Sequence, residues 1–376
     1  MSQNTLATKR KLNLNLGQYV YIIIFAALFL FYYIRSDGLT VSAITNILRH
    51  AAIAGILSYG MALIIITGDI DLSVGAIMCA VASFGCVFAN YLTDKGVPVG
   101  LGILLTVLFC LVGGTLLGFF NGFMVGKAKL PAFIVTLATS LIFRSVAKYS
   151  ATDDVTTKLL RGESANTYAM NRIETGDGIR ELMSEFGKIR LFSDSMKLPI
   201  LGIVFILIGI VLIYITTSTK YGKRLYAVGS NAKAAHMAGI NVEWTRVSVF
   251  TIAGLLCGIA AALWLCDKGK IDPATAGVNN EMYAIAAVVL GGISMSGGKG
   301  RVIGVIFGAL SYTLIDKIII ALEIKSTLIN DSIKGLILLV AIMIQILGPQ
   351  VKNLIASKKA KKAFIKKPIR KDRLFG

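Results

Sequence analysis

The glycine-rich block at 291–300 is the part of the sequence that most strongly suggests phosphate binding. It reads Gly-Gly-Ile-Ser-Met-Ser-Gly-Gly-Lys-Gly. A P-loop requires a glycine five residues before its Gly-Lys pair and a Ser or Thr directly after the lysine. Ile293 and Gly300 stand at these two positions, and Ile303 stands where a dinucleotide-binding fingerprint needs its third glycine. The chain therefore has no recognisable ATP site. We instead predict close packing of helices and a tight turn at Gly291, Gly292, Gly297 and Gly298.

A second polar segment, Gly68 to Gly75, carries two carboxylates in the pattern Gly-Asp-Ile-Asp-Leu-Ser-Val-Gly. Each carboxylate would cost about 2.5–3.5 kcal/mol at the centre of a bilayer. We therefore place Asp69 and Asp71 at the inner membrane interface, where Asp71 caps a helix that begins near Ser73. A catalytic or cation-binding carboxylate pair is the alternative, although no third oxygen-rich segment accompanies it.

The polar segment 218–246 contains a short predicted helix at 232–238. Asn231 can cap this helix and Gly239 can end it. Its alanines, among them Ala234 and Ala235, are small enough for a groove of another protein to close over them. A plain linker helix is the alternative. If the helix is a contact surface, we expect Ala235→Arg to block partner binding without affecting folding.

The composition is that of a membrane protein. Of the 376 residues, 55% are hydrophobic and only 16% are charged, against about 25% charged in soluble domains. The apolar residues form blocks of about 20, the length that a bilayer requires. This excludes a soluble enzyme, a disordered scaffold and a secreted disulfide domain. The predicted fold class is an all-α polytopic membrane protein.

Ten membrane spans are predicted from these blocks. The block at 282–296 contains Gly291 and Gly292 and is followed by Gly297 and Gly298, so a short or broken span is expected there. The predicted spans are 18–34, 41–66, 73–92, 99–125, 131–149, 198–217, 247–265, 282–296, 302–322 and 328–348.

The net charge of +19 comes almost entirely from the segments on one side of the predicted spans. With the N-terminus in the cytoplasm, the inner segments carry +18 and the outer segments −2. Because positive charge accumulates on the cytoplasmic side, both termini are predicted to lie inside. We expect a cytoplasmic segment at 1–17, a permease domain at 18–348 and a basic tail at 349–376. The tail suits anionic lipid headgroups, and no nucleic-acid binding is predicted.

The only sizeable outer region is 150–197, in which a short helix is expected near Ile179–Lys188. This region is too short for a catalytic domain. A cap that docks a partner and a plain surface loop both remain open.

Four blocks, in order, resemble the bacterial ABC sugar-importer permeases of the ribose/xylose/galactose type. The loop at 221–240 resembles their coupling loop, and the segments 68–75, 129–139 and 284–300 resemble three further motifs. Three features depart from the family pattern: Asp69 replaces a glycine, Ala132 replaces a proline, and the outer segment is longer.

This resemblance implies an inner-membrane transport subunit that works by alternating access and is not an enzyme. It implies a second permease chain, identical or different, two cytoplasmic ATPase subunits and an outer solute-binding protein. No cofactor is expected in this chain, since ATP and Mg²⁺ would bind the ATPase subunits. The residues that the resemblance assigns to ATPase contact are Asn231, Ala234, Ala235, Gly239 and Ile240.

Candidate pathway residues are polar side chains inside the spans. Each can also bond its own helix backbone if it is Ser or Thr. They are Asn46, Asn121, Thr136, Thr139 and Ser140.

Two other functions remain open. A permease of the same family could carry nucleosides or a small furanose signal. An ion-coupled secondary transporter would need a cluster of ionisable groups within the membrane, for which the spans offer Arg49, His50, Arg144, Asp316 and their neighbours.

Overall fold

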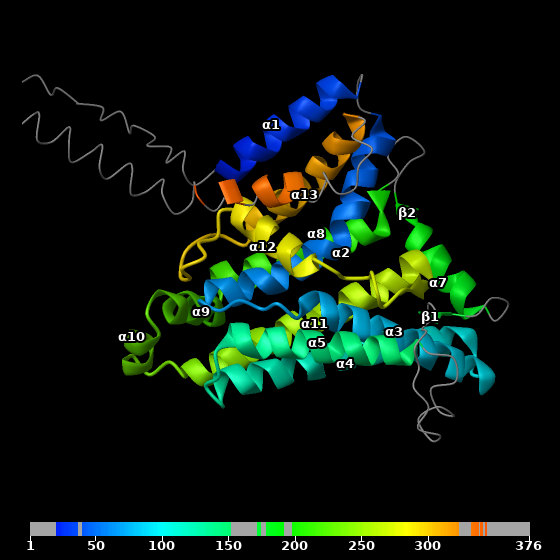
Figure 1. Cartoon of the computed structure of the whole chain (residues 1–376), viewed down its shortest axis with the longest axis horizontal. Coiled ribbons are helices and arrows are strands. Elements are labelled where there is room, and N and C mark those ends of the chain that lie inside the picture. Colours follow the sequence, from blue (N-terminus) through cyan, green and yellow to red (C-terminus); the bar gives the residue numbers. More distant parts are fainter. Residues whose placement is uncertain are drawn as a thin grey trace, which may run out of the picture.

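Long apolar helices dominate the computed structural model (Figure 1). The described residues are 20–36, 40–151, 171–173, 178–191, 198–322, 332–337, 339–340 and 343. The long helices are α1 (Val20–Arg35), α2 (Val41–Ile66), α3 (Val74–Asp94), α4 (Val99–Gly126), α5 (Ala132–Ser150), α8 (Ile200–Ser218), α11 (Val242–Lys268) and α13 (Ile303–Ala321).

Within this part of the chain, seven helices are long and apolar enough to cross a membrane: α2, α3, α4, α5, α8, α11 and α13. The predicted all-α membrane fold is thus confirmed, and the predicted edges of these seven spans agree to within a few residues. The predicted spans at 18–34 and 282–296 coincide with shorter apolar helices. The last, at 328–348, lies mostly outside the described residues.

Apart from the short helix at Asn280–Leu290, which packs among the long helices, the remaining described elements are short and lie at the two ends of the long helices (Figure 1). One end carries α9 (Lys220–Ser230) and α10 (Ala232–Met237). The other carries α7 (Ile179–Lys188), the short helix expected in the outer segment. Two antiparallel pairs of two-residue strands lie at that second end: β1 (Asn171–Arg172) with β4 (Lys270–Ile271), and β2 (Arg190–Leu191) with β3 (Leu198–Pro199).

Helices α4 and α11 touch along their backbones through a stripe of glycines. On α4 a glycine recurs every fourth residue, and α11 presents Gly254 and Gly258 to it. A Cβ atom on Gly118 would lie 2.5 Å from the Phe250 carbonyl oxygen and 2.6 Å from the Gly254 Cα. Small residues at this spacing let membrane helices approach closely, because lipid supplies no hydrophobic drive for helix association. The α4 glycines in contact are Gly114, Gly118, Gly122 and Gly126.

The short helix α12 (Asn280–Leu290) confirms the prediction of a broken span. At 1.5 Å per residue its 11 residues cover about 16 Å, against about 28 Å for the 19 residues of α13. The two helices meet where α12 ends, since a Cβ atom on Gly291 would lie 2.6 Å from the Gly304 carbonyl carbon. Before α12, the backbone at 272–279 is irregular. Arg144 donates to the Pro273 and Ala276 carbonyls there, at 3.2 and 2.9 Å, and so satisfies backbone that lipid could not.

Candidate coupling surface and transport pathway

Helix α10 begins and ends where the sequence predicts. The Asn231 side-chain oxygen accepts a hydrogen bond from the Ala234 amide at 2.9 Å, which satisfies one of the free N–H groups at the helix start. Gly239 has a φ of +80°, in the left-handed region that glycine adopts without strain. The result is a six-residue helix on a polar loop, with a side-chain cap at its start and a glycine just after its end.

Ala234 and Ala235 of α10 do not share a face, which corrects the expectation that both are available for contact. Ala235 is only 5% exposed and faces the protein, whereas Ala234 is exposed. The reason is packing of this short helix on α9 and α11, which its own sequence does not reveal. Ala235→Arg would therefore disturb folding, contrary to the expectation from sequence. The outward surface of α10, which we call the α10 face, consists of Lys233, Ala234, His236 and Met237.

The glycine-rich block lies between α9 and the end of α2. The Gly298 amide donates to the Ile66 carbonyl at 2.9 Å. The Tyr226 hydroxyl of α9 donates to the Gly300 carbonyl at 3.0 Å. A Cβ atom on Gly297 would lie 2.9 Å from the Gly229 carbonyl oxygen. The block thus joins the polar loop to the transmembrane helices, through the close backbone approach that its glycines predict.

Gly298→Ala is expected to weaken this joint. Gly298 has a φ of +66°, and a Cβ atom there would lie 2.6 Å from the Ser230 amide nitrogen. Strain plus overpacking should lower the stability by about 2–4 kcal/mol, measured as a loss of the folded fraction in a detergent thermal-shift assay. The matched control is Gly96→Ala, which has the same φ of +66° but meets nothing within 4 Å. Equal losses for the two variants would mean that backbone strain alone matters.

The linker between α2 and α3 is held by a buried polar network. Asp71 accepts hydrogen bonds from the Ser73 amide at 2.6 Å and the Ser73 hydroxyl at 2.5 Å. Asn121 of α4 donates to the same hydroxyl at 2.8 Å. Ser73, not Asp71, is the residue before the first helical residue of α3, so the predicted cap is corrected: Asp71 bonds the amide of the capping residue. Burial raises the pKa of the Asp71 carboxyl to about 6, although both bonds from Ser73 oppose that shift.

Asp69, which departs from the family pattern, is paired with a basic residue that sequence reasoning did not single out. Its carboxylate lies 3.1 Å from the Arg246 guanidinium of α11, and its side chain is only 10% exposed. Burial raises the pKa of Asp69, and the charge of Arg246 partly offsets that effect. The ion pair between Asp69 and Arg246 therefore joins the linker to α11. Because Asp69 is bound to Arg246 in this way, we interpret it as a structural residue rather than as half of a catalytic carboxylate pair.

The candidate pathway residues do not form one group. Thr136 accepts a hydrogen bond from the Leu72 amide at 3.1 Å, so Thr136 and Asn121 both contact the linker. Thr139 bonds the Thr136 carbonyl of its own helix at 3.3 Å, as expected for a structural role. Asn46 on α2 and Ser140 on α5 are half-buried, and the structure does not join them to that network.

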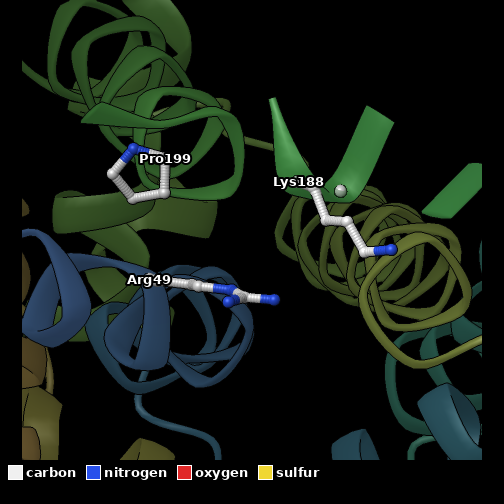
Figure 2. Close-up of a pocket in the computed structure, with 4 residues that line it drawn as sticks. Arg49, Lys188 and Pro199 are labelled. Carbon is white, nitrogen blue, oxygen red and sulfur yellow. The ribbon is translucent and has the colours of Figure 1, made fainter. Parts of the chain in front are cut away.

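At the opposite end of the molecule, Arg49 of α2 forms an ion pair with Asp267 of α11. Lys188 lies across a gap from it (Figure 2). The cavity that these basic residues line with Gly187 and Pro199 has a volume of about 50 Å³. Ligand pockets measure roughly 300–1,000 Å³, so this cavity is too small for a sugar.

Several of the ionisable residues within the predicted spans lie around the same cavity. His50, Asp316 and Lys317 line one cavity of about 370 Å³ together with Lys334. Arg144 is not among them, because its guanidinium is bonded to backbone carbonyls. The charges were visible in the sequence, but their meeting depends on how helices far apart in the chain pack.

Comparisons with known proteins identify the family. The family described as "Branched-chain amino acid transport system / permease component" matches residues 43–344. The xylose transport system permease protein XylH of Haemophilus influenzae is 32% identical over 88% of this chain and 96% of its own length. The ribose import permease protein RbsC of Bacillus subtilis is 32% identical over 89% and 92%. The fructose import permease protein FrcC of Rhizobium meliloti is 34% identical over 71% and 67%. No solved structure matches the chain.

These matches confirm the resemblance stated from the four sequence blocks and favour it over an ion-coupled transporter. They also support a multi-pass inner-membrane protein that is a transport subunit and not an enzyme. The chain belongs to this permease family, as an ABC importer permease of the ribose/xylose type.

Proposed function

We propose that the chain is the membrane-spanning permease of an ATP-driven importer for a monosaccharide. The observation that carries this proposal is its similarity to permeases named for xylose, ribose and fructose over most of its length. The sequence also lacks the spacing of a P-loop, which agrees with this proposal, because the energy of ATP hydrolysis is then supplied by another chain. ATP and Mg²⁺ bind two cytoplasmic ATPase subunits, and an outer solute-binding protein delivers the sugar.

The permease crosses the membrane ten times, with both termini in the cytoplasm. The charge distribution supports this orientation, since the inner segments carry nearly all of the positive charge. The permease domain is 18–348, preceded by a cytoplasmic segment at 1–17. The basic tail at 349–376 lies along anionic lipid headgroups. A second permease chain, identical or different, completes the pathway.

The α10 face contacts the ATPase subunit, and the glycine-rich block carries the movement into the membrane. Contacts support this route: Tyr226 on α9 bonds Gly300, and Gly298 bonds Ile66 at the end of α2. Directly after Ile66 comes the linker that Asn121 and Thr136 hold. Movement of the ATPase subunits can therefore reach the linker through bonded backbone rather than through flexible side chains.

The proposed function is tested by transport in proteoliposomes. The chain is purified from its own host together with the subunits that accompany it, and the uptake of radiolabelled xylose, ribose and fructose is measured with and without ATP. We expect ATP-dependent uptake of at least one sugar that an ionophore does not abolish and that excess leucine does not inhibit. Uptake that needs an ion gradient but no ATP would show a secondary transporter. Strong inhibition by leucine would point to an amino-acid importer.

A further inference from the structure

The cavity between α2, α12, α13 and the helical residues 332–337 has properties that coupling to an ATPase does not explain. Its volume is about 370 Å³, within the range of roughly 300–1,000 Å³ for small-molecule sites. Its lining is mostly polar or charged. The lining residues are His50, Tyr283, Thr313, Asp316, Lys317, Ile320 and Lys334.

The cavity lies at the first turn of the half-length helix α12, where Tyr283 lines it. Thr313, Asp316, Lys317 and Ile320 follow the i, i+3, i+4, i+7 pattern and thus share one face of α13. Asp316 lies about 20 Å along α13 from its first residue, Ile303. Since α12 runs only about 16 Å from its contact with the start of α13, α13 extends past it from Asp316 onward, whereas Thr313 still lies against Tyr283 of α12.

The polar groups of the cavity are held in fixed positions. The Asp316 carboxylate pairs with the Lys334 ammonium at 2.6 Å, and the two side chains are 31% and 20% exposed. The Tyr283 hydroxyl lies 2.7 Å from the Thr313 hydroxyl and donates to the Ala309 carbonyl at 3.2 Å. The ring of Tyr283 packs edge-on against Tyr312, with centroids 4.1 Å apart. Donors, acceptors and an aromatic ring are therefore present together.

Charged side chains inside a membrane span are too costly to face lipid, so the face of α13 that carries Asp316 and Lys317 must be covered by protein or by water. A purely structural ion pair would require only close packing around it, whereas here a cavity large enough for a small ligand adjoins the pair. Coupling to an ion gradient, the usual use of such clusters, does not suit an ATP-driven importer. The remaining use of this charged cluster is to bind a polar ligand that crosses the membrane.

We propose that this cavity binds the sugar during translocation. Neighbouring hydroxyls of a neutral sugar can donate to the Asp316 carboxylate and to the Tyr283 hydroxyl oxygen, and accept from the Lys334 ammonium. The ring of Tyr283 offers an apolar surface to the C–H face of the sugar. This inference rests on the proposed import of sugars, and it assigns to the permease itself part of the choice between sugars.

Two substitutions test the inference in the same reconstituted transporter. Asp316→Asn removes the charge, and Tyr283→Phe removes only a hydroxyl. The controls are Asp94→Asn and Tyr91→Phe, which change an exposed aspartate and an exposed tyrosine of α3 outside the cavity. Accumulation, association with the ATPase subunit, and uptake rates at low concentrations of xylose, ribose and fructose are measured for each.

We expect Asp316→Asn to lower uptake by about tenfold and Tyr283→Phe by roughly threefold, as loss of a charged and a neutral hydrogen bond implies. The ratio of uptake rates between sugars should also change, while accumulation and ATPase association stay as in the controls. If Asp316→Asn does not accumulate, the neutral pair Asp316→Asn/Lys334→Gln replaces it, because it leaves no unpaired charge.

Three results would overturn the inference. Uptake and sugar ratios equal to those of the controls would mean that the sugar does not contact this cavity. Loss of accumulation or ATPase association in Tyr283→Phe and the neutral pair alike would make the cluster structural. Failure of the unsubstituted transporter to carry any sugar would remove the proposed function itself, and this inference with it.

Discussion

Gly118→Leu is expected to abolish accumulation of the folded permease. Gly118 touches α11 through backbone atoms, because a Cβ atom added to it would lie within 2.6 Å of both the Phe250 carbonyl oxygen and the Gly254 Cα. Backbone cannot turn aside as a side chain can, so α4 and α11 would have to separate. Overpacking usually costs about 1–3 kcal/mol, and we expect at least about 3 kcal/mol here. Separation would also pull Asn121 away from Ser73.

The control for this prediction is Gly100→Leu. Gly100 lies on the same helix, is exposed and has nothing within 4 Å of its Cβ position. The same substitution is thus made on the same helix at a position without a steric conflict. The measurement is the yield of monodisperse protein in detergent after size-exclusion chromatography. Normal yield and thermal stability for Gly118→Leu would contradict the backbone contact between α4 and α11.

Local features could be predicted from the sequence because their causes are local. Asn231 and Gly239 bracket α10 as a cap and a stop signal, and α7 has the bounds that its sequence suggests. The apolar blocks gave the long helices because bilayer thickness sets their length. The broken span was predictable because a cluster of glycines favours a turn over a continued helix, and α12 ends at Leu290, directly before Gly291 and Gly292.

Features that depend on a partner helix could not be predicted in the same way. The glycines of α4 recur every fourth residue, which is a known signal for close helix packing, but the sequence does not say that α11 is the partner. Ala235 was misassigned because only the packing of α10 decides which alanine faces outward. Likewise, the sequence shows the charges of Asp316 and Lys334, but it does not show that the two side chains form an ion pair beside Tyr283.

Ala234→Arg is expected to release the ATPase subunit while leaving the permease folded. Ala234 is exposed on α10, so an arginine there meets no atom of its own chain that it must displace. Inside the groove of a partner, the long charged side chain must lose water or push the surfaces apart. That should cost about 1–3 kcal/mol, which corresponds to roughly 5- to 150-fold weaker docking at about 1.4 kcal/mol per tenfold change. Sugar uptake should fall with it.

Two comparisons separate docking from folding in this last prediction. Ala128→Arg places the same side chain on an exposed alanine of the loop between α4 and α5, and should leave ATPase binding unchanged. Ala235→Arg should instead lower thermal stability, since Ala235 is buried. The measurement is the amount of ATPase subunit that co-purifies with each tagged permease, together with thermal stability in detergent. If Ala234→Arg keeps its ATPase subunit and transports sugar at the unsubstituted rate, α10 is a linker and the ATPase docks elsewhere. If Ala234→Arg loses the ATPase subunit while Ala128→Arg keeps it, the α10 face is the surface through which the ATPase subunit acts on the transmembrane helices.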